Sequence, residues 1–327
     1  MRRGFLPPAL MGVLIVALGV YSELHQSTFL SKANLTNLLV AAMPLVLVSL
    51  GQATALLVGG FDISVAALMT LCVVVASFTM TPGMSAGSLT LGALALVGVG
   101  LATGIFNTIL IRVLRLPSIV ATLGTLSVLE GASLLLRGFP QGPISTDATS
   151  ALTTTVGFVP LAFVGVVILA TLADLWLYRT RAGLALRAVG LDATSSRRLG
   201  MSTGRTILLA FVLCSLLASF AGFFLAAEVQ VGSPIIGNQA LESIAAAVLG
   251  GASLAGGKGS FFGTMLAALF LTEINNVLPL FQQPAEYADM TIGVLILVAL
   301  VLYELPELIA RYGASRQRLD GEAAATS

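Results

Sequence analysis

The sequence predicts an all-α, polytopic membrane protein with about ten transmembrane helices and both termini in the cytoplasm. Hydrophobic residues make up 57% of the 327 positions, charged residues only 9%, and the mean hydropathy is +1.00. Soluble domains carry about 25% charged residues. Basic residues are gathered between apolar runs, which is the pattern that orients a membrane protein. The composition gives no indication of nucleic-acid binding, and the lipid bilayer is the expected environment.

Ten apolar runs suit a hydrocarbon core about 30 Å thick, which needs roughly 20 helical residues. Counting from a cytoplasmic start after Arg2 and Arg3 places fourteen of the sixteen basic residues on one face, with only Lys32 and Arg137 outside. One early helix more or fewer would invert every later loop. The predicted spans are 5–22, 36–58, 63–80, 89–111, 118–137, 157–178, 206–228, 241–256, 260–279 and 287–304.

The segment 59–64, Gly-Gly-Phe-Asp-Ile-Ser, separates the second and third spans. One reading is a tight cytoplasmic turn in which Asp62 caps the next helix by accepting backbone N–H bonds. The other is a broken helix lining a polar cavity, where irregular backbone is tolerated at membrane depth. The two readings are compatible, and both remain open.

The fifth span opens at Pro117, a residue suited to a helix start, and carries Thr122, Gly124 and Thr125 within one turn. Small and hydroxylated residues at this spacing indicate either close helix packing or a polar pore wall. Farther along, Glu130 and Glu273 lie inside apolar runs. A carboxyl group there must be paired, protonated or in contact with water, and is a candidate for function.

Two long polar segments interrupt the later spans. Residues 138–156 are rich in Gly, Pro, Ser and Thr and are expected outside, between two sets of five helices. Residues 179–205 hold six of the sixteen basic residues against the single acidic Asp192, and are expected in the cytoplasm. This segment exceeds the two to eight residues, roughly, that join neighbouring helices. We interpret it as a surface on which a soluble partner docks.

The chain is expected to form a single transmembrane domain over 1–312, followed by a disordered cytoplasmic tail over 313–327.

Cys72 and Cys214 are interpreted as packing residues, and His25 is a lone histidine, so no metal site is predicted. The segment 256–260 superficially resembles a phosphate loop but lacks the glycine and the Ser or Thr required around its lysine. No catalytic motif is visible, and the chain itself is expected to be neither an enzyme nor a binder of cofactors.

Three stretches resemble one family, the permease subunits of bacterial ATP-binding cassette (ABC) importers for ribose and related carbohydrates, including xylose, galactose and autoinducer-2. Residues 59–65 resemble G-G-x-D-[IL]-S-V, and 117–125 resemble P-x-I-x-T-L-G-T. Residues 241–264 resemble the longer pattern of alanines and glycines that follows E-L in the family. The resemblance covers nearly the whole chain and implies a multi-pass protein of the bacterial inner membrane.

The resemblance also implies partners: a second permease subunit, two cytoplasmic ATPase subunits that bind the ATP and Mg, and a periplasmic sugar-binding protein. Segment 179–205 then corresponds to the coupling segment that seats in the ATPase. Asp192 replaces the asparagine of the family pattern, and Ser195-Ser196 replace an alanine pair. The coupling residues are expected to be Arg187, Gly190, Asp192, Arg197, Arg198 and Gly200.

A sugar crossing the membrane must exchange its hydration for hydroxyl, amide and carbonyl partners. Side chains able to provide such partners, together with the helix break, define the expected translocation path. Its residues are Gly59, Gly60, Asp62, Ser64, Asn107, Thr122, Gly124, Thr125, Asn275 and Asn276.

Two other functions compete with the importer subunit. One is an ion-coupled secondary transporter in which Asp62, Glu130 or Glu273 binds the ion near the midplane. The other is an intramembrane enzyme or receptor, for which the sequence shows no catalytic constellation.

Overall fold

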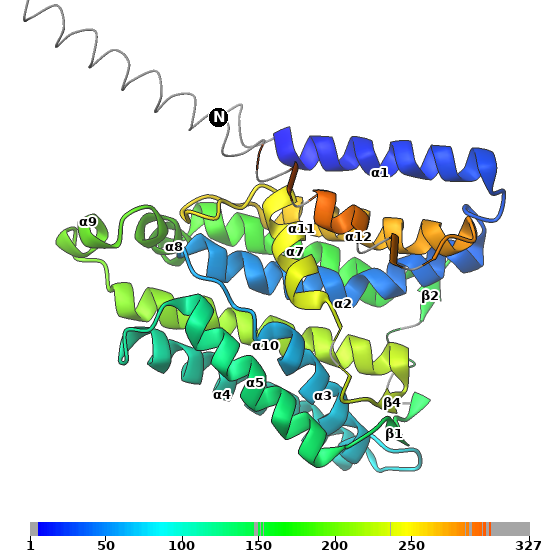
Figure 1. Ribbon diagram of the computed structural model, residues 1–327, viewed down its shortest axis with the longest axis horizontal. Helices are drawn as coiled ribbons and strands as arrows, with labels where there is room; N and C mark the ends of the chain where they lie inside the picture. The colour runs from blue at the N-terminus through cyan, green and yellow to red at the C-terminus, as the bar shows by residue number, and fades with distance from the viewer. Residues whose placement is uncertain are drawn as a thin grey trace, which may run out of the picture.

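The computed structural model describes residues 6–301, except 147–149, 151, 153, 236, 285, 288–289, 296 and 299–300. The predicted tail over 313–327 and part of the predicted span 287–304 lie outside the described residues. Within them the chain is a bundle of helices with two short pairs of strands (Figure 1). The helices are α1 Leu6–His25, α2 Lys32–Leu57, α3 Val65–Thr79, α4 Ala86–Arg112, α5 Ser118–Leu136, α7 Leu161–Arg179, α8 Arg181–Leu191, α9 Ala193–Arg198, α10 Thr203–Val229, α11 Gln239–Leu249 and α12 Phe261–Leu280.

Seven of these helices are long and apolar enough to cross a membrane: α1, α2, α4, α5, α7, α10 and α12. The described chain is therefore that of a polytopic helical membrane protein. Helices α3 and α11, with 15 and 11 residues, are shorter than the roughly 20 residues that a full crossing requires. Both follow irregular backbone: residues 58–64 precede α3, and the described residues 233–235 and 237–238 precede α11.

The predicted span 241–256 is too long, since α11 ends at Leu249. Gly250 caps the helix, and Gly251 follows with a φ of +104°, a conformation that other residues rarely adopt. Gly250 also lies directly against the backbone of Gly263 and Thr264 at the start of α12. The chain after α11 therefore turns through an irregular loop, residues 250–260, before α12 begins.

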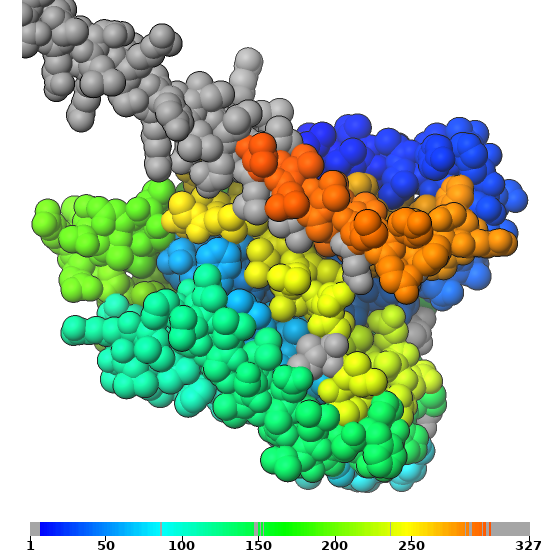
Figure 2. Space-filling model, in the orientation of Figure 1, coloured from blue at the N-terminus to red at the C-terminus, as the bar shows by residue number. Residues whose placement is uncertain are grey.

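Short elements between the long helices lie at both ends of the bundle (Figure 1). At one end, β1 (Gln141–Pro143) pairs with β4 (Val231–Gly232), and β2 (Thr155–Val156) pairs with β3 (Val159–Pro160). These strands depart from the all-α expectation because loop backbones that meet at a bundle end satisfy each other's hydrogen bonds. At the other end lie α8 and α9, which project in light green at the left of Figure 2.

Helix α2 is at the centre of the bundle and α1 at its edge. Of the most hydrophobic 18-residue window of each helix, 83% is buried in α2 and 11% in α1. Helix α10 packs along α2, α3 and α4, and α12 packs between α1 and α2. Small residues permit these close approaches: a Cβ at Gly104 of α4 would lie 2.7 Å from the Cα of Val212 in α10.

Replacement of Gly104 by Ala should destabilise the bundle relative to the matched replacement Gly98→Ala. Both glycines are in α4 and both gain helix propensity, but a Cβ at Gly98 has no atom within 4 Å. Overpacking at Gly104 should cost about 1–3 kcal/mol, seen as a lower thermal midpoint of the detergent-purified protein. Equal midpoints for the two variants would show that α4 and α10 are not packed as described.

Candidate functional site

The segment 59–64 combines a tight turn with a stretch of extended backbone. After α2 ends at Leu57, Gly59 has a φ of +73° and the Gly60 N–H donates back to the Ala55 carbonyl at 3.0 Å. The following backbone N–H groups of Phe61 and Ile63 donate to side chains of α5. The chain therefore turns at Gly59 and then runs in extended form to α3, where the Asp62 carboxylate accepts the Ser64 N–H. That this segment lines a polar cavity stays a prediction.

Hydroxyl groups of α5 satisfy the backbone of this break. The Phe61 N–H donates to Ser118 Oγ at 3.1 Å, and the Ile63 N–H donates to Thr122 Oγ1 at 3.2 Å. A buried backbone group without a partner is costly, so these side chains make the interruption possible. Ser118 was not among the predicted site residues, although its place at the start of the fifth span was visible.

Asp62 belongs to a buried polar network that joins α3, α4 and α5. It has no exposed surface, and its Oδ1 accepts hydrogen bonds from the backbone N–H and the hydroxyl of Ser64. Asn107 of α4 donates to Asp62 Oδ2 at 3.2 Å and to Ser64 Oγ at 3.0 Å, and Thr125 of α5 donates to Asn107 Oδ1 at 2.6 Å. The carboxylate is held by protein donors, which fixes the three helices relative to one another.

Segment 179–205 folds into two short helices with conventional caps. Thr180 accepts the Gly183 N–H at the start of α8, and Asp192 accepts the N–H groups of Thr194 and Ser195 at the start of α9. The hydroxyl of Ser195 and these backbone donors hold the pKa of the exposed Asp192 carboxyl below its ordinary value. The carboxylate therefore stays ionised as the N-cap of α9.

The basic residues predicted to contact a partner lie on exposed parts of this segment. Arg197 and Arg198 end α9 and are exposed, and Gly200 follows with a φ of +82°. Arg187 of α8 is only half-exposed, because its guanidinium stacks over the ring of Tyr178 at 4.7 Å. These cations form a protruding surface at one end of the bundle, with α9 at its tip (Figure 1).

Three backbone segments meet where α8 touches the membrane bundle: the end of α2, the end of α8 and the loop before α12. We call this contact the glycine junction, and it consists of Leu57, Gly59, Gly190, Gly256 and Gly257. The Gly257 N–H donates to the Leu57 carbonyl at 2.9 Å. A Cβ at Gly190 would overlap that same carbonyl, and one at Gly256 would lie 2.8 Å from the Gly190 carbonyl oxygen and 2.9 Å from the Gly59 nitrogen. Segment 179–205 therefore abuts the helix break directly, backbone against backbone.

A second bridge runs from α8 through α7 to α12. Asp174 of α7 accepts the Phe261 N–H at 2.6 Å and the Ser260 hydroxyl at 2.9 Å, which caps α12. Tyr178 donates to the Gly259 carbonyl at 2.8 Å and carries Arg187 on its ring. Sequence reasoning missed Asp174 and Tyr178. The signal was present, because Asp174 is a carboxylate within an apolar run, as Glu130 and Glu273 are.

The predicted path residues divide between the two ends of the bundle. Asp62, Ser64, Asn107, Thr122 and Thr125 form one group near the glycine junction, and Gly124, on the same helix α5, is exposed. Gly59 lies in the glycine junction itself and Gly60 follows it, whereas Asn275 and Asn276 line a polar cavity of about 460 Å³ near the opposite end of α12.

The polar cavity is formed by α2, α10 and α12. Asn34 and Asn276 exchange hydrogen bonds across it, each 3.1 Å long. Asn37, Glu228 and Asn275 also line it. Sequence reasoning missed Asn34, Asn37 and Glu228, because polar residues near a helix end are ordinary there and only the fold brings them together. The arrangement offers amide and carboxylate groups of the kind that bind hydroxyl-rich solutes.

The three carboxyl groups singled out as possible ion sites have different surroundings. Asp62 is enclosed in its network, Glu130 is half-buried on α5, and Glu273 lies in a second, apolar cavity. Within the described part of the chain, no group of three or more His, Cys, Asp or Glu residues could hold a metal ion.

Comparison with known proteins identifies relatives over most of the chain. A family model described as "Branched-chain amino acid transport system / permease component" matches residues 34–300. The autoinducer 2 import system permease protein LsrC of Enterobacter sp. (strain 638) is 36% identical over 306 residues, which cover 90% of this chain and 83% of that protein. Proteins of the same name from Klebsiella pneumoniae and Salmonella typhimurium are 35% and 34% identical, over 91% and 88% of this chain and 87% and 82% of theirs. No solved structure was found to match the chain.

Replacement of Thr125 by Val should destabilise the protein by about 1–3 kcal/mol, because Asn107 Oδ1 loses its donor in a buried site. The matched control is Thr171→Val in α7, where the hydroxyl is exposed and bonds only the Val167 carbonyl of its own helix. Thermal unfolding of the purified variants measures the difference. A Thr125 variant as stable as the Thr171 variant would mean that the network contributes nothing to the fold.

Proposed function

Because the chain belongs to the family of permease components of branched-chain amino acid transport systems, we propose that it is the membrane-spanning subunit of an ABC importer for a carbohydrate. The solute is a pentose, a hexose or a related small polar molecule, and the chain itself carries out no chemistry. The relatives are named for import of autoinducer 2, which supports a small polar solute.

The observation that carries the proposal is the glycine junction. A soluble motor can drive a membrane bundle only through a surface that protrudes from it and is mechanically continuous with it. Helices α8 and α9 protrude, and Gly190 joins them to the end of α2 and to the loop before α12. A displacement of α8 therefore bears on the helix break and, through Phe61 and Ile63, on α5.

The proposed partners follow from this arrangement. Two cytoplasmic ATPase subunits bind the ATP and Mg and receive α8 and α9, with Arg187, Gly190, Asp192, Arg197, Arg198 and Gly200 as the coupling residues. A second permease subunit completes the membrane part, and a periplasmic binding protein delivers the solute. Exposed arginines on the docking surface favour an acidic groove in the ATPase.

The proposed path uses the polar cavity as its outer part. Each buried hydroxyl group of a sugar needs a hydrogen-bond partner, since an unpaired one costs several kcal/mol in a dry site. Asn275 and Asn276 provide amide groups there, with Asn34 and Glu228 beside them. The Asp62 network lies near the other end, where its role in the path is to hold the break that the coupling segment moves.

The proposed placement in the bacterial inner membrane has about ten spans, both termini in the cytoplasm and one domain over 1–312. The positions of two arginines at the ends of the bundle support the orientation derived from the distribution of basic residues. Arg112 lies near Gly204 at the end that carries α8 and α9, whereas Arg137 contacts Ser77 near the paired strands. The end with the coupling segment is the cytoplasmic one.

No observation favours the ion-coupled alternative to the same degree. Asp62 is already hydrogen-bonded by Ser64 and Asn107. Glu273 faces an apolar cavity whose second carboxylate, Glu23, lies at the rim and accepts the Leu30 N–H. An ion-coupled transporter would need only this chain, whereas an importer subunit needs ATP and its partners.

The proposal predicts that vesicles with the complete complex take up solute only with ATP, and that Arg197→Glu with Arg198→Glu abolishes that uptake. Reversal of two exposed charges should weaken association with the ATPase by about tenfold or more. A close charge pair across an interface contributes at least about 1.5 kcal/mol to the binding free energy. Co-purification of the ATPase and radiolabelled uptake measure both effects.

The control is Arg115→Glu, an exposed reversal at the same end of the bundle but outside the coupling segment. It should leave association and uptake near the wild-type level, and all variants should insert normally. Uptake by the isolated chain in ATP-free vesicles under an ion gradient would refute the importer and favour a secondary transporter.

A further inference from the structure

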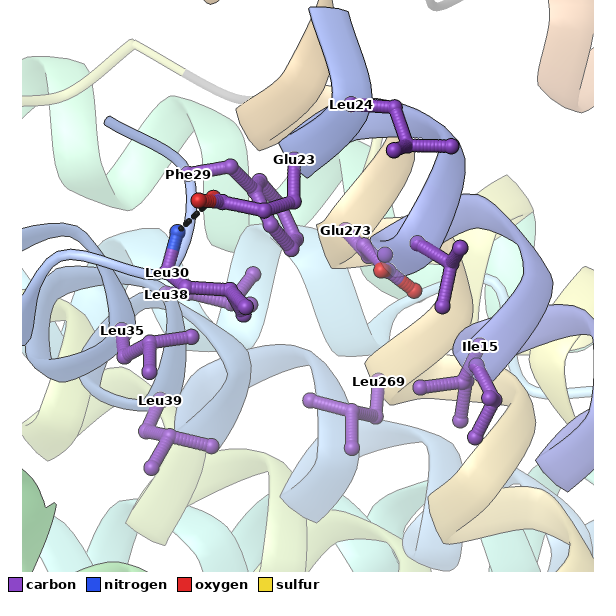
Figure 3. A pocket seen from close by; sticks show the side chains of 13 residues that line it. Ile15, Glu23, Leu24, Phe29, Leu30, Leu35, Leu38, Leu39, Leu269 and Glu273 are labelled. Atoms are coloured by element: carbon purple, nitrogen blue, oxygen red, sulfur yellow. Dashed lines mark hydrogen bonds between the residues drawn. The ribbon is translucent and has the colours of Figure 1, made fainter. Parts of the chain in front are cut away.

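An apolar cavity lies between α1, α2 and α12 and shares no lining residue with the polar cavity (Figure 3). It encloses about 460 Å³, within the range of about 300–1,000 Å³ that is usual for small-ligand sites. Leucine, valine, isoleucine and phenylalanine side chains form most of its wall, so a hydroxyl-rich solute would find few partners there. Its occupant must be largely hydrocarbon.

The cavity opens beside the exposed face of α1. Helix α1 is a candidate membrane span, and Val16, Val20 and Leu24 at the rim of the cavity are 65%, 55% and 77% exposed. The inner wall is closed by Phe29 and Leu38, which are buried. In a bilayer the molecules that reach such an opening are the acyl chains of the surrounding lipids.

One polar side chain, that of Glu273, points into this apolar cavity. Glu273 is 2% exposed, and its Oε2 atom has no hydrogen-bond partner among the described residues. Figure 3 shows its carboxyl group turned toward the space beside α1, whereas Glu23 at the rim accepts the Leu30 N–H at 2.9 Å. A carboxyl group in such a site needs a partner, and the neutral acid is the form that hydrocarbon tolerates without a counter-ion. The neutral acid has an O–H group to donate.

Gly19 of α1 keeps the space beside this carboxyl group open. A Cβ at this position would lie 3.3 Å from Glu273 Oε1 and 3.4 Å from the ring of Phe29. A larger side chain would extend beyond those contacts into the cavity. The absence of a side chain at position 19 thus gives an incoming molecule access to Glu273.

We propose that this cavity binds a membrane phospholipid, with one acyl chain along the apolar wall and an ester carbonyl accepting a hydrogen bond from the carboxyl group of Glu273. The apolar wall accounts for the chain, the lipid-facing opening for its entry, and the unpartnered carboxyl group for the single polar contact. The site is independent of the solute path and of the ATPase surface.

Photo-crosslinking tests the proposal on the full-length chain in phosphatidylcholine nanodiscs. The probe is phosphatidylcholine with a diazirine on its acyl chain near the ester, and mass spectrometry locates the adducts. Adducts should concentrate on residues 15–24 and 269–273 relative to the exposed α5 residues Val128 and Leu135. Gly19→Leu should lower the cavity adducts by about tenfold, the loss expected when 1.4 kcal/mol or more of affinity is removed.

The matched control is Gly12→Leu, on the same helix α1, because a Cβ there has no atom within 4 Å. It should label like the wild type. Glu273→Gln keeps the shape and a donor and should retain the adducts, whereas Glu273→Leu should reduce them. The Glu273 pair decides the question even if Gly19→Leu does not fold.

Two results would overturn the proposal. Labelling of the cavity no higher than that of α5, and unchanged in Glu273→Leu, would mean that only bulk lipid touches this surface. A cross-link between the α1 helices of two copies, formed by a bifunctional thiol reagent on the variant Val16→Cys, would mean that the opening is an interface between copies.

Discussion

At the glycine junction the carbonyl end of α2 is shared between α8 and the loop that precedes α12, and no Cβ fits between them. The Leu57 carbonyl accepts the Gly257 N–H, and Gly190 lies against the same carbonyl. Direct backbone contact leaves no flexible side chain to absorb a displacement. Every proposed step of transport passes through this contact, because it is where the protruding helices join the break in the bundle.

The break itself is stable because its polar groups are satisfied from neighbouring helices. Two hydroxyl groups of α5 accept backbone N–H groups of the break, and Asn107 ties Asp62 to α4. A helix interruption in a membrane persists only under such compensation. The same bonds make the break a junction of α3, α4 and α5, so that a movement at the end of α2 reaches three helices at once.

The sequence predicts most of the long helices to within a few residues, because apolar runs and basic loops are strong signals in a membrane protein. It overestimates α11, because the close packing of Gly250 on Gly263 is a tertiary contact that hydropathy does not report. It groups Asn107 and Thr125 with Asn275 and Asn276 by chemistry, whereas the fold separates them between the two ends. Sequence reasoning misses Asp174 and Tyr178 because their partners, Phe261 and Gly259, are more than 80 residues away in the chain. Residue type indicates which side chains are unusual, but only packing decides which of them meet.

The most direct test of the central claim is ATP-driven solute uptake by the complete complex carrying Gly190→Ala. A methyl group at this position displaces α8 from the Leu57 carbonyl. Uptake per ATP hydrolysed should therefore fall by about tenfold or more, which corresponds to the loss of a contact that contributes about 1.4 kcal/mol. The control Gly165→Ala in α7, where a Cβ has no atom within 4 Å, should transport normally. Wild-type coupling in the Gly190 variant would contradict the account.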